Sequence, residues 1–324
     1  MNRDARIAVV GSFAVGLTMK VERFPESGET LLGAGYRMDH GGKGSNQAVA
    51  CARLGAQVSF VARIGTDALA DMALKLYRDE GVDSAWLRQE ADLPTGVGFI
   101  LVKSGTGENC IALDAGANNL LTAEAVSASE GALSSAQVVL TQLEIPIEAA
   151  EAAMKLGRAH RAVTILNPAP ARAVPPTLLQ QVDVLTPNQS EARTLLGLEP
   201  GTKADPAEMA RALLRRGPRQ VIVTLGEEGA FIATADFEKH IPAISVTSVD
   251  STGAGDAFNA GLAVSLARGE DLESAVRFAV VAGGLAVTRE GVIPALPRLA
   301  EVLEWCERLG LNIPAWVENK RKDQ

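Results

Sequence analysis

The 324-residue sequence has little cysteine, few aromatic residues and no long uninterrupted apolar run. Its cysteines, Cys51, Cys110 and Cys306, are widely spaced and odd in number, which excludes a disulfide framework and a zinc motif. We expect all three to be reduced thiols, buried as small hydrophobic side chains. No segment reaches the ~18 to 20 apolar residues that a membrane span needs, and the N-terminus has no signal-peptide pattern. The expected location is the cytoplasm, without membrane contact.

The sequence also lacks an excess of basic residues. It carries 39 Asp and Glu against 31 Lys and Arg, a net charge of −8 with neutral His. A general nucleic-acid binder needs a basic footprint, so we expect no nucleic-acid partner, although a local phosphate site stays possible. With 47% hydrophobic and 22% charged residues, the composition excludes disorder for most of the chain.

Short apolar runs alternate with helical patterns along most of the chain. Strands are predicted at 7–10, 58–62, 138–143, 163–167, 182–186 and 220–224. Helices are predicted at 44–54, 67–80, 147–160, 189–196 and 206–216, and in the C-terminal third at 257–268, 272–288 and 296–309. This alternation predicts an α/β fold with a mostly parallel central sheet and helices on both faces. Residues 316–324 are expected to form a charged tail.

Two segments interrupt the alternation. Residues 30–40 and 96–113 have the pattern of antiparallel strands, with a turn at 103–109, and neither lies where a parallel strand is expected. They predict a small extra β-sheet that projects from the main body, built from segments at about 13–40 and 95–114. Residues 1–315 are then expected to form one domain that carries this small sheet.

The two common glycine-rich phosphate loops are absent, although the chain has 31 glycines. Gly42 and Lys43 are followed by Gly44 instead of Ser or Thr, and Arg37 stands where the P-loop needs its first glycine. No G-x-G-x-x-G follows the first predicted strand. Three other glycine clusters remain as candidates.

The first cluster, DSTGAGD, runs from Asp250 to Asp256 and directly precedes a helical pattern. Small residues at a helix start leave backbone N–H groups free to bind an anion. Asp256 would repel a resident phosphate, but it suits a reaction in which it accepts a proton from an attacking hydroxyl while the anion develops. The alternative is that Asp256 caps the helix. The local spacing favours neither interpretation.

The other two clusters are HGGKGSNQ, from His40 to Gln47, and TLGEEGA, from Thr224 to Ala230. In the first, glycine permits close approach of the backbone to a polar ligand, with Lys43 and Asn46 as hydrogen-bonding groups. Taken alone, however, the first cluster favours a plain glycine turn and the second a hairpin turn.

Together and in this order, the clusters resemble the ribokinase (PfkB-type) carbohydrate kinase family, over roughly Ile7 to Leu309. GGKGSNQA at 41–48 and DSTGAGD at 250–256 are similar to its two signatures. Between them lie GANN at 116–119, QLE at 142–144, NPAPA at 167–171 and NQSE at 188–191, the last similar to the family's N-x-x-E motif. The QLE and NPAPA segments resemble the ribokinase branch in particular.

The resemblance implies a ribokinase-like fold and transfer of the γ-phosphoryl group of ATP to a primary hydroxyl of a pentose or similar sugar. Asp256 would be the base, with the amides of Gly253, Ala254 and Gly255 as the anion hole. The implied sugar contacts, besides Asp256, are Gly42, Lys43, Asn46 and Glu144. The implied nucleotide contacts are Asn188, Thr224, Gly226, Gly229 and Gly255.

The resemblance also implies two cations and a second copy of the chain. Glu191, with Asn188, would help to place Mg²⁺, largely through water. An activating K⁺ would lie near Asp250, Thr252, Ala286, Arg289, Gly291 and Ala295. The small sheet would be a lid over the sugar, which in this family often forms a homodimer interface.

The first loop departs from the family pattern. Gly16 stands where ribokinases usually have an Asp that binds sugar hydroxyls, and Phe13 and Ala14 occupy a stretch where Asn is common. Losing a charge-assisted hydrogen bond costs about 1.5–3 kcal/mol unless it is replaced. Either the pocket is roomier or less polar and takes a deoxy, branched or other non-ribose substrate, such as a hexose or nucleoside, or another residue or water replaces the Asp. A non-catalytic sugar sensor would be favoured by loss of Asp256 or the loop glycines, but all are present.

Overall fold

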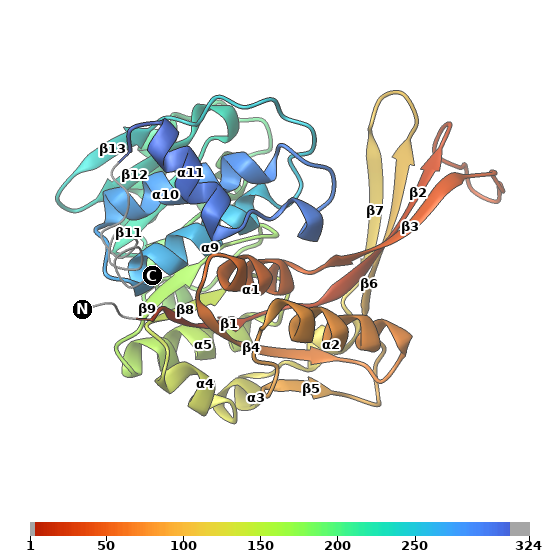
Figure 1. The fold of residues 1–324 in the computed structure, drawn as a ribbon, viewed down its shortest axis with the longest axis horizontal. Coiled ribbons are helices and arrows are strands. Elements are labelled where there is room, and N and C mark those ends of the chain that lie inside the picture. Colours follow the sequence, from red (N-terminus) through yellow and green to blue (C-terminus); the bar gives the residue numbers. More distant parts are fainter. Residues whose placement is uncertain (1–3, 312–324) are drawn as a thin grey trace.

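The computed structural model describes residues 4–311, which contain a large and a small β-sheet (Figure 1). The large sheet has the strand order β13-β12-β11-β10-β9-β8-β1-β4-β5. Its strands are β1 (Arg6–Val10), β4 (Gln57–Ile64), β5 (Leu87–Gln89), β8 (Val138–Thr141), β9 (Val163–Leu166), β10 (Val184–Leu185), β11 (Gln220–Thr224), β12 (Ala230–Thr234) and β13 (Glu238–Ile241). The predicted charged tail at 316–324 lies outside the described residues.

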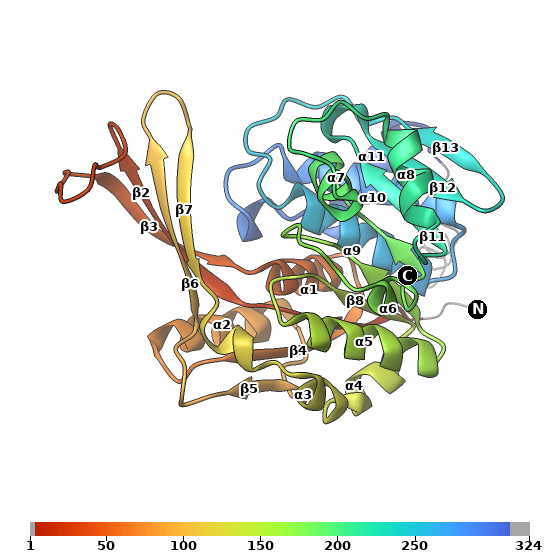
Figure 2. The same ribbon diagram turned by 180° about the vertical axis from the view of Figure 1, so that it is seen from behind.

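Helices cover both faces of the large sheet, as predicted (Figures 1 and 2). Along β1, Ile7 and Val9 belong to one hydrophobic cluster and Ala8 and Val10 to the other, because successive side chains point to opposite faces. One face packs against α1 (Lys43–Arg53), α2 (Ala68–Glu80), α9 (Ala254–Ala267), α10 (Leu272–Ala286) and α11 (Leu299–Arg308). The other packs against α3 (Ala123–Ser127), α4 (Glu130–Ser134), α5 (Ile147–Ala159), α6 (Pro176–Leu179), α7 (Gln189–Leu196) and α8 (Pro206–Leu214).

The small sheet stands out from the main body (Figure 2). Its order is β3-β2-β6-β7, with strands β2 (Ala14–Val21), β3 (Ala34–Gly41), β6 (Gly96–Lys103) and β7 (Asn109–Asp114). The projecting extra sheet is therefore confirmed. The expectation of purely antiparallel strands is wrong, because β2 pairs in parallel with β6 and joins the two antiparallel hairpins.

Three strands at the two edges of the large sheet were not predicted. At one edge, β5 pairs in parallel with β4. At the other, β12 and β13 continue the sheet antiparallel beyond β11. The predicted turn at 224–230 is confirmed as the connection between β11 and β12, and it contains the 3-10 helix η2 (Gly226–Glu228). The predicted strand at 182–186 is reduced to the two residues of β10.

The strand order reverses beside β1. The chain runs from β1 out to β4 and β5 and then returns to the other side of β1 as β8, with all these pairings parallel. Open α/β sheets bind ligands outside the carboxyl ends of their strands at such a reversal. The loops that leave β1, β8, β9, β10 and β11 therefore mark the edge where a site is expected.

Two of the three cysteines are buried, as predicted. Cys51 and Cys306 are buried free thiols, and burial raises the pKa of Cys306 to about 11. Cys110 is exposed, so the expectation that all three cysteines are buried is wrong for this one. It lies on β7, the edge strand of the small sheet, where every residue is exposed. Among the described residues, no helix is long and apolar enough to span a lipid bilayer.

Candidate functional site

The start of α1 packs directly on the loop that follows β1. A Cβ on Gly44 would lie 2.5 Å from the backbone nitrogen of Ser12. Gly42 has φ 85°, and its Cβ would lie 2.7 Å from Cα of Phe13. The N–H of Ser45 donates to the carbonyl of Ser12 at 2.9 Å. These glycines are thus required by backbone packing, which places the first turn of α1 at the carboxyl end of β1.

Glu144, from the loop after β8, lies against the same helix start. Its Oε2 accepts hydrogen bonds from the backbone N–H of Lys43 at 2.8 Å and from Oγ of Ser12 at 2.6 Å. A carboxylate is stabilised at a helix N-terminus by the helix dipole. These two bonds fix Glu144 through one oxygen and leave Oε1 for other partners.

Asp256 is held from α1, although it lies on α9. Its Oδ2 accepts from Nδ2 of Asn46 and its Oδ1 from Nε2 of Gln47, both at 2.9 Å. The carboxylate is buried, and α9 begins after Gly253 without a side-chain cap. Helix capping by Asp256, the alternative left open above, is therefore not what the structure shows.

Four charged side chains share this region. Burial raises the pKa of Asp256, while the Lys43 ammonium and the two amide donors partly oppose the rise. Burial works to lower the pKa of Lys43, but the charges of Asp256, Glu144 and Glu191 outweigh it and raise that pKa. Lys43 therefore stays protonated among three carboxyl groups. Burial also raises the pKa of Glu191.

The loop before α9 is shaped by its glycines in two ways. Gly253 has φ 83°, and its Cβ would lie 2.8 Å from Cγ1 of Val292. Ala254 donates its N–H to the carbonyl of Ser251 at 3.3 Å, so this predicted anion-hole amide already has an acceptor. At Gly255 a Cβ would meet no atom within 4 Å. Among the glycines of residues 4–311 without a positive φ, Gly255 alone has this property, which leaves open space beside the helix start.

Asp250 joins the two loops that were predicted to surround a monovalent cation. Its Oδ1 accepts from the N–H of Thr252 at 2.9 Å and its Oδ2 from the N–H of Gly291 at 3.0 Å. Burial works to raise the pKa of Asp250, but these hydrogen bonds outweigh it and lower the pKa. Ala286 ends α10 and Ala295 lies in the 3-10 helix η3 (Ile293–Ala295), on either side of Gly291 in the second loop. The sixth position, Arg289, pairs its guanidinium with Glu301.

Four of the five predicted nucleotide positions lie at or after the ends of β10 and β11, and the fifth, Gly255, lies on α9. Asn188 and Glu191 form a capping box at the start of α7, with both bonds at 2.8 Å. Asn188 forms a β-bridge with Thr224, which brings the two loops together. Gly226 has φ 62° with no atom near its Cβ, whereas a Cβ on Gly229 would lie 2.1 Å from the carbonyl oxygen of Ile241. Gly229 is therefore required by the hairpin itself.

Comparison with known proteins agrees with this geometry. The family model for pfkB family carbohydrate kinases matches residues 4–299. The chain belongs to this family. A ribokinase of Haemophilus influenzae is 35% identical over 301 residues, covering 93% of this chain and 98% of that protein. A deoxyribokinase of Salmonella typhi is 34% identical and covers 94% of this chain and 99% of that protein. The structure of Arabidopsis thaliana ribokinase with ribose and ATP is similar with a TM-score of 0.87 at 31% identity, covering 93% of this chain and 98% of that one.

This carbohydrate kinase contains a buried hydrogen-bond network whose residues were not predicted to belong to the site. Gln142 donates to Oε1 of Gln47, and Nε2 of Gln47 donates both to Asp256 and, at 3.1 Å, to Oδ1 of Asn167. The network continues through Thr186 and Asn259 to the carbonyl of Gly255, with the last two bonds at 2.6 and 2.8 Å.

A signal for these residues was present in the sequence. Gln142, Asn167 and Thr186 each follow or end an apolar strand of the pfkB-type sheet at its carboxyl end. A buried polar side chain at that position needs a partner. The partners are 95 residues apart in the case of Gln142 and Gln47, so the sequence alone does not pair them.

Two buried acceptors in this region have no protein partner. They are Oδ1 of Asn46 and Oε1 of Gln142, among the described residues. An unpaired buried polar atom costs free energy, so such atoms are usually satisfied by water or a ligand. Oδ1 of Asn46 belongs to the amide that holds Asp256, and it is therefore placed to accept from a ligand hydroxyl.

The ring of Phe13 is part of the hydrophobic core of this kinase, contrary to the less polar pocket that its position in the first loop suggested. Its ring is fully buried and packs near Tyr77 and His40, at centroid distances of 6.1 and 6.5 Å. Its backbone N–H and carbonyl are both bound by the amide of Asn118, at 3.0 and 2.8 Å. The GANN motif thus fixes the first loop in place.

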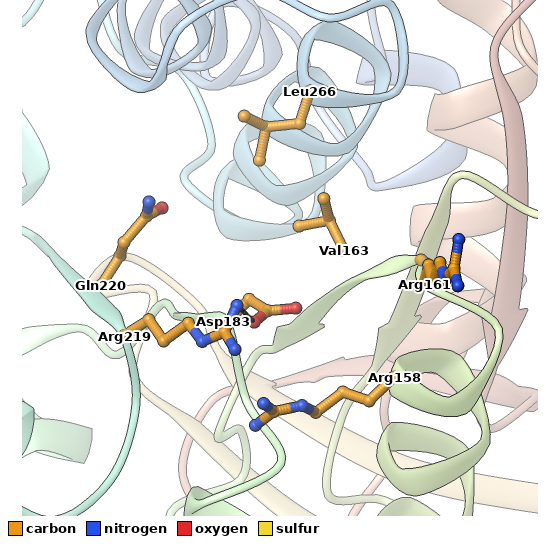
Figure 3. A pocket seen from close by; sticks show the side chains of 8 residues that line it. Arg158, Arg161, Val163, Asp183, Arg219, Gln220 and Leu266 are labelled. Atoms are coloured by element: carbon orange, nitrogen blue, oxygen red, sulfur yellow. Dashed lines mark ion pairs between the residues drawn. The ribbon is translucent and has the colours of Figure 1, made fainter.

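A hollow of about 460 Å³ lies at the opposite, amino-terminal edge of the large sheet (Figure 3). Val163 begins β9 and Gln220 begins β11, and both line it. Arg219 pairs with Asp183 there at 3.3 Å. None of the predicted site residues lines this hollow, and it is separate from the site of the kinase.

Proposed function

We propose that this carbohydrate kinase transfers the γ-phosphoryl group of ATP to a primary hydroxyl of a pentose. The observation that carries the proposal is the placement of Asp256. It is a buried carboxylate, held by Asn46 and Gln47 beside Lys43, one residue from the open space at Gly255. Relatives named ribokinase and deoxyribokinase support a pentose as the acceptor class.

In this proposal Asp256 accepts the proton of the attacking hydroxyl. The amides of Asn46 and Gln47 fix the carboxylate toward the substrate, and burial raises its pKa, which makes it a stronger proton acceptor than an exposed Asp. Oε1 of Glu144 and Oδ1 of Asn46 accept hydrogen bonds from other sugar hydroxyls. Lys43 and the backbone N–H groups at the start of α9 stabilise negative charge on the transferring group.

The residues at hand fit the two proposed cations. Mg²⁺ keeps several waters and is usually held by one or two carboxylates and the substrate phosphates. Glu191 suits this role, because only its Oε2 is used in the capping box. Within the described residues no three His, Cys, Asp or Glu gather into a metal cluster, so a cage of such ligands is not expected. The loops joined by Asp250 would hold K⁺, and both ions would offset phosphate charge when bound.

We further propose that the small sheet is a lid and a homodimer interface. Of the exposed large hydrophobic side chains in residues 4–311, most lie on this sheet or its connecting loop: Met19, Leu32, Tyr36, Met38, Phe99, Ile111 and Leu113. Met38, Leu17 and Phe99 form one row across three strands. Such an apolar patch marks a protein contact. Phe99→Lys should convert a dimer to a monomer in sedimentation, whereas Phe237→Lys, in the turn between β12 and β13, should not.

An ADP-release assay with D-ribose, 2-deoxy-D-ribose, hexoses and nucleosides tests the proposed reaction. We expect turnover with a pentose and a large loss for Asp256→Asn, with ATP affinity kept within about twofold. Turnover with only hexoses or nucleosides would overturn the pentose assignment. Absence of turnover with every compound would favour the sensor alternative, and wild-type kcat in the variant would remove Asp256 from its role. The cytoplasmic location stays a prediction.

A further inference from the structure

A carboxylate lies directly across the small sheet from Gly16. Gly16 of β2 is paired with Asp39 of β3 on one side and with Gly98 of β6 on the other. Residues directly opposite one another in neighbouring strands point to the same face of the sheet. Asp39 therefore stands beside two positions that have no side chain of their own, and only the flexible ends of Ile100 and Leu113 lie within 4 Å of where their Cβ atoms would be, apart from the carbonyl oxygen of Asp39 itself.

This face of the small sheet is the one that leads to the site. Two residues before Asp39 on the same face, Arg37 pairs with Glu290 at 2.7 Å. Gly291, which follows Glu290 in the chain, donates its N–H to Asp250, the first residue of the DSTGAGD segment. The opposite face carries His40, whose ring lies near Phe13 and the backbone of Met72 on α2.

Asp39 is also the single carboxylate on this face. Among the paired positions of the four strands, the acidic residues are Asp39 and Asp114. Asp114 is paired with Val97, which lies on the opposite face because it neighbours Gly98 in the strand. The register thus gives the site-facing surface one acidic group, and it is adjacent to the position where the family resemblance places an Asp.

We propose that Asp39 supplies the carboxylate that binds sugar hydroxyls at this end of the site, in place of residue 16. The proposal rests on the proposed function and names a specificity-determining residue for it. Cβ positions of directly opposed residues are about 4.5–5.5 Å apart. A carboxylate at 39 therefore reaches over Gly16 into the volume that an Asp at 16 would fill.

The state of the Asp39 side chain suits this role. Its Oδ2 pairs with Nε of Arg37 at 2.7 Å, which orients the carboxylate. This pair uses Oδ2 and leaves Oδ1 for a ligand. The side chain is 38% exposed, so a ligand can reach it. A carboxylate accepts strong, charge-assisted hydrogen bonds from hydroxyl groups, which suits the hydroxyl groups of a sugar.

Of the two alternatives left open by Gly16, a carboxylate at Asp39 favours replacement of the missing Asp by another residue. The acidic group is moved to the neighbouring strand, so the pocket keeps its polarity and ribose stays a good acceptor. Position 16 can still accept a side chain. A Cβ there would lie 3.3 Å from Cδ1 of Ile100, the flexible end of a side chain, and 3.7 Å from the carbonyl oxygen of Asp39.

The test is to remove the carboxylate at position 39 and to introduce one at position 16. Wild type, Asp39→Ala, Gly16→Asp and the double variant are assayed with D-ribose and 2-deoxy-D-ribose, with the KM for ATP measured in each. We expect Asp39→Ala to lower kcat/KM for the better sugar by about 10- to 100-fold, mainly through KM. The KM for ATP should change less than twofold. Gly16→Asp in the Asp39→Ala background should recover at least tenfold.

Arg37→Ala is the matched control for a merely structural role. It breaks the Arg37 pairs with Asp39 and Glu290 but keeps the carboxylate, so the KM for sugar should rise less than in Asp39→Ala. Equal losses in the two variants, without rescue by Gly16→Asp, would overturn the inference. So would an Asp39→Ala enzyme with unchanged sugar kinetics. A wild type that phosphorylates neither sugar would instead overturn the proposed function on which this inference stands.

Discussion

The Gly255→Ala variant tests whether Gly255 is required for binding of the phosphoryl group or for the stability of the fold. The residue is the second of α9, and its φ is not positive. A Cβ there would meet no atom within 4 Å. Replacing Gly by Ala in a helix stabilises it by about 0.5–1 kcal/mol. For a chain of this length we expect Tm to rise by about 1–3 °C.

Activity should change in the opposite direction. The new methyl group would occupy the space that we assign to the transferring phosphoryl group. Displacing reacting atoms by about 1 Å costs about 100-fold in rate, which corresponds to about 2.7 kcal/mol of transition-state stabilisation. We therefore expect kcat to fall about 100-fold while the protein becomes slightly more stable.

Thermal unfolding and steady-state kinetics on the same preparation measure both effects. Gly253→Ala is the control, because φ 83° and the close Val292 predict a lower Tm for it. A Gly255→Ala variant with wild-type kcat would show that the phosphoryl group does not lie beside this residue. A fall in its Tm would show that the space at Gly255 is not free.

Three further predictions concern the base, the hairpin and the cation. The Gln47 amide lowers the pKa of Asp256, which must be ionised to act as the base. Gln47→Leu should therefore move the acid limb of the pH profile of kcat/KM to higher pH. An unmoved limb would show that this hydrogen bond does not set the pKa of the base. Gly229→Ala should lower Tm by several degrees in unfolding scans, since its Cβ would lie 2.1 Å from Ile241 O at φ 96°, and an unchanged Tm would contradict the packing argument. Replacing K⁺ by tetramethylammonium at constant ionic strength should lower kcat in wild type but not in Asp250→Ala, and equal responses would remove Asp250 from the proposed cation site.

Much of the fold followed from local patterns. The strands of the parallel sheet are buried on both faces, so they appear in the sequence as apolar runs such as that of β1. The small sheet was predictable because its segments break the alternation. β12 and β13 were missed because they form an antiparallel hairpin at the edge of the sheet. No helix separates the two strands, and β13 (Glu238–Ile241) consists mostly of polar residues.

The candidate site was only partly predictable. The position of Asp256 at the start of a helix was evident, but its two hydrogen-bond donors come from α1, more than 200 residues away in the chain. Some glycines that seemed to belong to ligand loops, such as Gly44 and Gly229, are instead required by the close approach of two backbones. Their roles depend on neighbours that no local pattern contains.

The sequence by itself indicated the alternation of helices and strands along most of the chain, the family and the candidate reactive side chains, because these follow from apolar periodicity and from motifs of neighbouring residues. Only the tertiary structure decided which of these side chains meet. Lys43, Glu144, Glu191 and Asp256 come from four separate segments, and their pKa values depend on the burial and the charges that the fold brings together. Likewise, the register of β2 and β3 places Asp39 on the same face of the small sheet as Gly16, because a shift of one residue would turn it to the other face.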